Sequence, residues 1–127
     1  MRSRYFAGTG VAAAFALALA ASPVQAHHGW SGQGTEGFEL AGTVQTAVSL
    51  AGPHATMSIK DKNGQVWDLT LAPPARTERA GLKQGVIPVG AAVTIRGKRN
   101  NDPKRFEVKT ERVTHAGKTY DVYPDRS

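Results

Sequence analysis

The residues of this chain with the most distinctive chemistry are its four histidines, His27, His28, His54 and His115. His27 and His28 are adjacent and directly follow Val24-Gln25-Ala26, a small-x-small pattern typical of an export cleavage site. Cleavage at that point would free the α-amine of His27 beside its own imidazole, so that the two nitrogens could chelate a metal ion together. Nitrogen ligands arranged in a plane suit Cu(II), which prefers tetragonal N,O geometry.

A third nitrogen is available from His54, which follows Pro53 in a turn after the first predicted strand. The sequence therefore predicts a copper site made of His27, His28 and His54. An α-amine has a reference pKa of about 7.7 to 8.0 and must lose its proton to bind metal, so copper affinity should rise with pH through that range. The alternative is that the adjacent histidines are solvated and that His54 is a hydrogen-bonding loop residue. We interpret His115, which precedes Ala116-Gly117, as a polar surface residue of a turn.

The N-terminal segment has the order of a secretory signal. Arg2 and Arg4 precede an apolar run over residues 11–21, which Pro23 ends before the cleavage pattern. This run is shorter than the roughly 20 apolar residues that a membrane-spanning helix needs, so we expect no membrane span. The sequence predicts a signal peptide over 1–26 and a periplasmic or secreted protein.

The charge of the chain is mildly basic after this leader is removed. The leader holds two of the 16 basic residues and none of the 10 acidic ones, so the formal charge falls from +6 to +4. Export makes nucleic acid an improbable partner despite this charge. Six basic residues alternate with acidic and polar ones, as on a solvated sheet face, and we expect them at the surface: Lys98, Arg99, Lys104, Arg105, Lys109 and Arg112.

Arrangements typical of catalysis are poorly represented. The chain contains no cysteine, no Gly-x-Ser-x-Gly elbow and no phosphate-binding glycine loop before a helix. Glu36 and Glu39 alone do not indicate paired-carboxylate hydrolysis. We therefore expect no enzyme, and oxidative chemistry at an N-terminal copper site is the least favoured hypothesis.

The elements that must position these residues read as β-strands. A glycine-rich arm over 27–37 precedes an alternating apolar pattern over 38–50 with Gly42 within it, which predicts a long strand bent at its glycine. A second strand around residues 57–59 and a third over 66–71 are joined by Asp61-Lys62-Asn63-Gly64, whose Asn-Gly pair supplies the positive φ angles of a hairpin turn. Trp67 in the third strand is expected in the core.

The second half of the mature chain predicts a short helix and further strands. The helix lies within 73–82, begins at proline and ends near Gly81, and strands follow over 91–95, around 106–113 and over 120–123. Three strands, a helix and two strands with an extension are the order of the OB barrel. We predict an all-β, five- to six-stranded OB-like barrel over 38–127 with a short helix between strands 3 and 4. A small β-sandwich is the alternative.

Several motifs resemble those of the small exported bacterial proteins grouped as DUF6152. They are Gly42-Thr43-Val44, Gly52-Pro53-His54-Ala55, Asn63-Gly64, Trp67-Asp68-Leu69, Leu82-Lys83-Gln84-Gly85, 89–95 and Arg99-Asn100-Asn101-Asp102. In that family the loop usually reads Asn-Pro-His, and here Gly52 takes the Asn position while His54 remains. The resemblance implies an exported barrel similar to OB-fold periplasmic modules, and it supports pairing the histidine-bearing start with the Pro-His loop.

Two functional hypotheses follow. The first is an exported periplasmic binding module that holds copper through His27, His28 and His54. The second is a metal-free interaction module that binds an anionic glycan, a small molecule or an envelope protein on the barrel face. Residues available for that face are Arg96, Lys98, Arg105 and Trp67. Sensitivity to chelators would favour the first hypothesis, and a steep dependence on salt would favour the second.

Overall fold

The computed structural model describes residue 34 and residues 37–126 of the chain. The predicted leader, 1–26, lies outside the described residues, as does the predicted arm, 27–37, apart from Gly34 and Gly37. In chain order the described elements are β1 (Phe38–Ser49), β2 (Thr56–Lys60), β3 (Val66–Thr70), α1 (Pro74–Arg79), β4 (Ala92–Arg99), β5 (Glu107–His115), β6 (Lys118–Asp121) and the 3-10 helix η3 (Pro124–Arg126).

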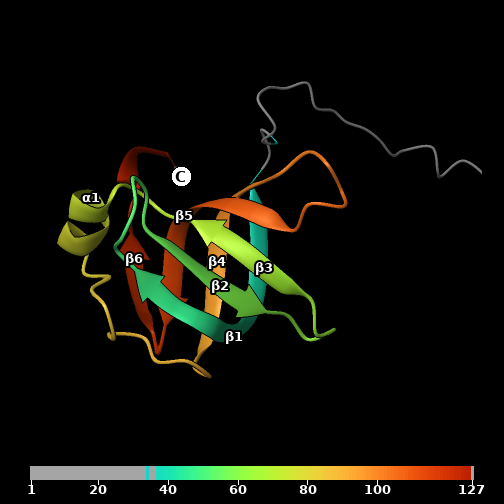
Figure 1. The fold of residues 1–127 in the computed structure, drawn as a ribbon, viewed down its shortest axis with the longest axis horizontal. Coiled ribbons are helices and arrows are strands. Elements are labelled where there is room, and N and C mark those ends of the chain that lie inside the picture. The colour runs from blue at the N-terminus through green and yellow to red at the C-terminus, as the bar shows by residue number, and fades with distance from the viewer. Residues whose placement is uncertain (1–33, 35–36, 127) are drawn as a thin grey trace, which may run out of the picture.

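The strands form one sheet that closes on itself (Figure 1). Its order is β3-β2-β1-β4-β5-β6, and a parallel pairing of β3 with β5 closes the first five strands into a barrel. β6 pairs antiparallel with β5 as an additional strand. The predicted OB-like barrel with a short helix between the third and fourth strands is therefore confirmed, and the β-sandwich alternative is wrong.

The first strand serves two neighbours. Residues 38–43 of β1 pair with β4, and residues 43–49 pair with β2 with two register shifts. A Cβ added to Gly42 would lie 2.6 Å from the carbonyl oxygen of Lys60, well inside van der Waals contact. Glycine at this position therefore allows the backbones of β1 and β2 to approach closely where β1 passes from one neighbour to the other.

The β2–β3 hairpin is closed by the carboxylate of Asp61. Its Oδ1 accepts the backbone N–H of Asn63 at 2.8 Å and of Gln65 at 3.0 Å, and its Oδ2 accepts the indole N–H of Trp67 at 3.0 Å. The Trp67 hydrogen bond is the largest cause that lowers the pKa of Asp61, and the two backbone bonds outweigh desolvation with it. Of the turn dipeptide, only Gly64 has a positive φ, +84°, so the prediction of a positive φ at Asn63 is wrong.

The predicted core position of Trp67 is confirmed, since its side chain is 5% exposed. Its ring centroid lies 5.4 Å from that of Phe38 and 5.1 Å from that of Phe106. The guanidinium carbon of Arg99 lies 4.7 Å from the Trp67 centroid and within 6 Å of the other two rings. Arg99 is thus half-buried over an aromatic cluster rather than fully solvated, and its Nη2 donates to the carbonyl of Pro103 at 2.9 Å.

The short helix α1 follows the end of β3. Pro74 occupies its first turn, where the missing N–H is not needed, and the chain leaves the helix through Gly81 with a φ of +102°. The buried hydroxyl of Thr77 donates to the carbonyl of Ala72 at 2.8 Å and fixes the helix to the end of β3. Figure 1 shows α1 at one end of the barrel beside β6. Arg76, the residue before the buried Thr77, is exposed.

The last strand differs from the sequence prediction. β6 spans Lys118–Asp121 rather than residues 120–123, so Tyr123 lies beyond the strand. Ala116 and Gly117 both adopt positive φ, 51° and 79°, and form the turn that reverses the chain from β5 into β6. The short β6 brings the segment from Tyr123 to η3 back to the end of the barrel that carries α1 (Figure 1).

Candidate functional site

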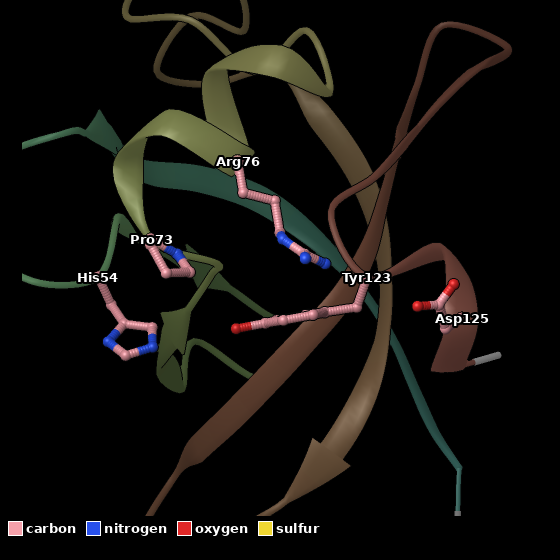
Figure 2. Close-up of a pocket in the computed structure, with 5 residues that line it drawn as sticks. All are labelled: His54, Pro73, Arg76, Tyr123 and Asp125. Carbon is pink, nitrogen blue, oxygen red and sulfur yellow. The ribbon is translucent and has the colours of Figure 1, made fainter.

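A pocket of about 300 Å³ opens beside α1, and we call it the His54 pocket. Its lining comes from three parts of the chain: the β1–β2 loop, the start of α1 and the segment after β6 (Figure 2). The lining residues are His54, Pro73, Arg76, Tyr123 and Asp125. The barrel thus brings one of the predicted site residues together with four that sequence reasoning did not select.

Arg76 and Tyr123 form the centre of this pocket. The guanidinium carbon of Arg76 lies 5.5 Å from the centroid of the Tyr123 ring, within the range of a cation–π contact. The ammonium of Lys109, on β5, lies 5.9 Å from the same centroid. Figure 2 shows the Tyr123 hydroxyl directed toward the side of the pocket on which His54 lies. Two cationic groups therefore surround one phenol ring.

The charges of the pocket are unevenly placed. Among the described residues, no carboxylate lies within 4.0 Å of the Arg76 guanidinium, whereas Arg96, Lys98, Arg105 and Arg112 each have such a partner. Figure 2 shows Asp125 at the far end of the pocket from His54, with Tyr123 between them. The pocket therefore holds one guanidinium without an ion-pair partner among the described residues, together with the Asp125 carboxylate.

Of the three predicted metal ligands, the structure describes only His54. His54 is exposed in the β1–β2 loop and lines the pocket, and no hydrogen bond joins its ring to another described residue. His27 and His28 lie outside the described residues. Within the part of the chain that the structure describes, no three His, Asp or Glu side chains are placed to hold a metal ion.

The chain just before β1 is fixed at one described point. The backbone N–H of Gly34 donates to the carbonyl of Arg99 at 2.7 Å, next to the start of β1. His54 follows the other end of this 12-residue strand. The described residues therefore do not show the histidine-bearing start beside the Pro-His loop, and the copper site stays a prediction.

His115 is the last residue of β5 rather than a turn residue. Its Nδ1 lies 3.1 Å from the carbonyl oxygen of Ala92, so the ring is engaged by the first residue of β4. The interpretation of His115 as part of a turn is wrong, because the turn consists of the two residues that follow it.

The basic residues expected on an anion-binding face differ in the carboxylates that they contact. Lys98 lies 3.7 Å from the buried carboxylate of Glu111, and Arg105 lies 3.5 Å from Glu107. Arg96 lies 3.8 Å from Glu39, beyond hydrogen-bond distance, and lines a shallow hollow on the outer sheet face. Trp67 is buried and unavailable as a contact surface.

Sequence reasoning missed Arg76, Tyr123 and Asp125 because no local pattern joins them to His54. Their side chains meet only after the sheet closes and β6 returns the chain to the α1 end of the barrel. A usable signal was present for Arg76, since the predicted helix 73–82 contains it and follows the strand paired with the one after His54.

None of the helices in the described part of the chain has the length and apolar character of a membrane span. Comparison with curated proteins and with solved structures finds no match. A family model does match: residues 14–109 fit DUF6152, described as a family of unknown function. This match covers well over half of the 127 residues and includes β1 to β4 with the β1–β2 loop that bears His54. The chain therefore belongs to the DUF6152 family.

Proposed function

We propose that this protein is an exported binding module that holds a small anionic ligand in the His54 pocket. The observation that carries the proposal is Arg76, which lines an open pocket without a carboxylate partner among the described residues. An unpaired guanidinium offers a planar fork of donors that matches a carboxylate or phosphate. The leader pattern over 1–26 supports export to the periplasm or the exterior.

The neighbours of Arg76 favour a compact anion. Tyr123 lies under the guanidinium and restricts its movement, so less side-chain entropy is lost when a ligand binds. Lys109 adds a second positive charge near the same ring, and the exposed His54 ring adds a hydrogen-bonding group elsewhere in the pocket. A volume of about 300 Å³ suits a small molecule rather than a polymer.

The test compares two arginines of the same helix. Binding of phosphate and of citrate to the full chain is measured by calorimetry for wild type, Arg76→Ala and Arg79→Ala. A hydrogen bond to a charged group contributes about 1.5 to 3 kcal/mol, so Arg76→Ala should weaken binding by about tenfold or more. Arg79 is also exposed on α1 but does not line the pocket, so its substitution controls for charge.

Salt and chelators supply the second readout. Anion binding should weaken steeply as ionic strength rises and should be unaffected by a chelator. Equal losses of anion affinity in Arg76→Ala and Arg79→Ala would show that net charge causes the effect, and the pocket would be rejected as the binding site.

A second candidate function is copper binding through His27, His28 and His54. The observation that favours it is the free ring of His54 in a pocket that also holds the Asp125 carboxylate, because Cu(II) accepts nitrogen and oxygen ligands. Intact mass should place the mature start at His27. Copper titration should then lose stoichiometric binding in His27→Ala or His54→Ala, while His115→Ala, whose ring contacts Ala92, serves as the control. Unchanged affinity in both site variants would reject copper binding.

A further inference from the structure

The outer face of the sheet carries a row of four charged side chains on four neighbouring strands. The pairing registers place Glu39 of β1 beside Arg96 of β4, Arg96 beside Arg112 of β5, and Arg112 beside Asp121 of β6. We call this the charged row. Its order is negative, positive, positive, negative, and at a strand spacing of about 4.8 Å it extends for about 14 Å.

The centre of the charged row is an unfavourable arrangement. Like charges directly opposite on adjacent strands destabilise a sheet, and Arg96 and Arg112 are direct partners. Only one hydrogen bond to a described residue engages the pair, from Nε of Arg112 to Asp121 at 3.2 Å. The ion pair of Arg96 with Glu39, at 3.8 Å, is too long for a hydrogen bond. An anion between the two guanidiniums would relieve the repulsion and use their remaining donors.

A row of hydroxyl groups lies alongside. Thr94 of β4 is the partner of Thr114 of β5, which is the partner of Thr119 of β6. The hydroxyls of Thr114 and Thr119 are 3.2 Å apart, and a hollow of about 140 Å³ lies between this row and the two arginines. Hydroxyls both donate and accept hydrogen bonds, so this row suits a ligand that carries hydroxyls of its own.

The backbone holds Arg96 in position. A Cβ added to Gly37 would lie 2.8 Å from Nη2 of Arg96, so the guanidinium packs directly against this glycine. A donor group held by packing binds with a smaller loss of side-chain entropy. Gly37 thus acts as a positioning residue for Arg96.

We infer that this face binds an acidic oligosaccharide in which a single uronate is flanked by neutral sugars. The two central arginines would take the carboxylate, and the threonine row would take the sugar hydroxyls. Glu39 and Asp121 at the ends of the charged row would repel further negative charge, so a polyanion fits poorly. This surface shares no residue with the His54 pocket, and the inference does not rest on the proposed function.

The test is an NMR titration of the full chain in an Arg76→Gln background, which removes the anion-binding guanidinium of the His54 pocket. The probes are a xylo-oligosaccharide bearing one glucuronate, the same oligosaccharide without it, and polygalacturonate. We expect the glucuronate probe to shift amides of β4, β5 and β6 and to bind at least tenfold more tightly than the neutral one.

Three variants assign the binding. Arg96→Gln should weaken it at least tenfold, and Gly37→Ala should also weaken it although it removes no charge. Lys104→Gln removes a charge from the β4–β5 loop and should leave binding unchanged. Equal binding of the neutral probe, tighter binding of polygalacturonate, no binding, or affinity unchanged in Arg96→Gln would each overturn the inference. A failure of phosphate binding at Arg76 in the calorimetric test would leave this result unaffected.

Discussion

Replacing Gly97 by alanine tests the closest approach of two strands in the barrel. A Cβ at this position would lie 2.1 Å from the carbonyl oxygen of Lys109 and 2.9 Å from Cα of Thr110. Both atoms belong to the backbone of β5, so no flexible side chain can move aside. Gly97 also sits at the register shift between β4 and β5, which falls between Arg96 and Gly97. The strands must therefore separate locally by more than 1 Å to restore ordinary contact, at about 3.4 Å or more.

The expected cost combines two effects. Inserting a group into a packed region costs about 1 to 3 kcal/mol, and the upper end applies because backbone must move. Loss of one neighbouring ladder hydrogen bond adds about 1 kcal/mol. We expect the free energy of unfolding to fall by about 4 kcal/mol, out of a total of about 5 to 15 kcal/mol for a domain of this size. The melting temperature should fall by about 16 to 32 °C.

Urea unfolding followed by circular dichroism measures the effect, with the free energy obtained by linear extrapolation. Gly37→Ala is the matched control, since its new methyl group meets only the end of the Arg96 side chain and should change stability by about 0.5 kcal/mol or less. If Gly97→Ala unfolds within about 1 kcal/mol of wild type, the close packing of β4 on β5 is not the constraint described above.

Three further predictions concern the core, the helix and the hairpin. Ile95→Ala, at a fully buried site, should lower the free energy of unfolding in urea by about 2 to 5 kcal/mol. Thr94→Ala, at the exposed position beside it, should lower it far less, and similar losses for the two variants would contradict the inward orientation of Ile95. Thr77→Val removes the buried hydrogen bond to Ala72 and should lower the unfolding free energy by about 1 kcal/mol, and an unchanged melting temperature would argue against that bond. The lowered pKa of Asp61 means that its stabilising effect is full above the unfolded value of about 3.9 and is lost as pH falls through the lower folded pKa. Urea midpoints measured below pH 4 should therefore fall less steeply for Asp61→Asn than for wild type, and parallel curves would refute this assignment.

Much of the barrel was predictable because its signals are local. Alternation of apolar residues, the Asp61 to Gly64 turn and the proline before α1 each act within a few residues, and the structure confirms the elements they predict. The aromatic contacts of Arg99 were not predictable, because a basic residue in an alternating strand has the same local pattern whether or not it packs on aromatic rings. Its burial depends on Phe38, Trp67 and Phe106, which come from three other strands or their edges.

Of the residues that line the candidate site, only His54 was predicted from the sequence. The Pro-His turn marked His54 as a residue of interest, whereas Arg76 has only its place in the predicted helix 73–82 and Tyr123 has no signal in the sequence. They join His54 because the chain crosses from β3 through α1 and later returns through β6 to the same end of the barrel. The pairing of Arg96 with Arg112 likewise depends on the register of β4 against β5, including its shift at Gly97.

Composition and periodicity by themselves determined an all-β chain with one short helix, because side-chain alternation and turn chemistry are properties of neighbouring residues. Closure of the sheet decided which distant side chains meet, since only the parallel pairing of β3 with β5 and the addition of β6 set those distances. A pocket assembled from residues 54, 76 and 123 is a consequence of that closure. The spacing of residues in the sequence does not predict this pocket, because contact between distant segments depends on the register of strands that pair across the whole chain.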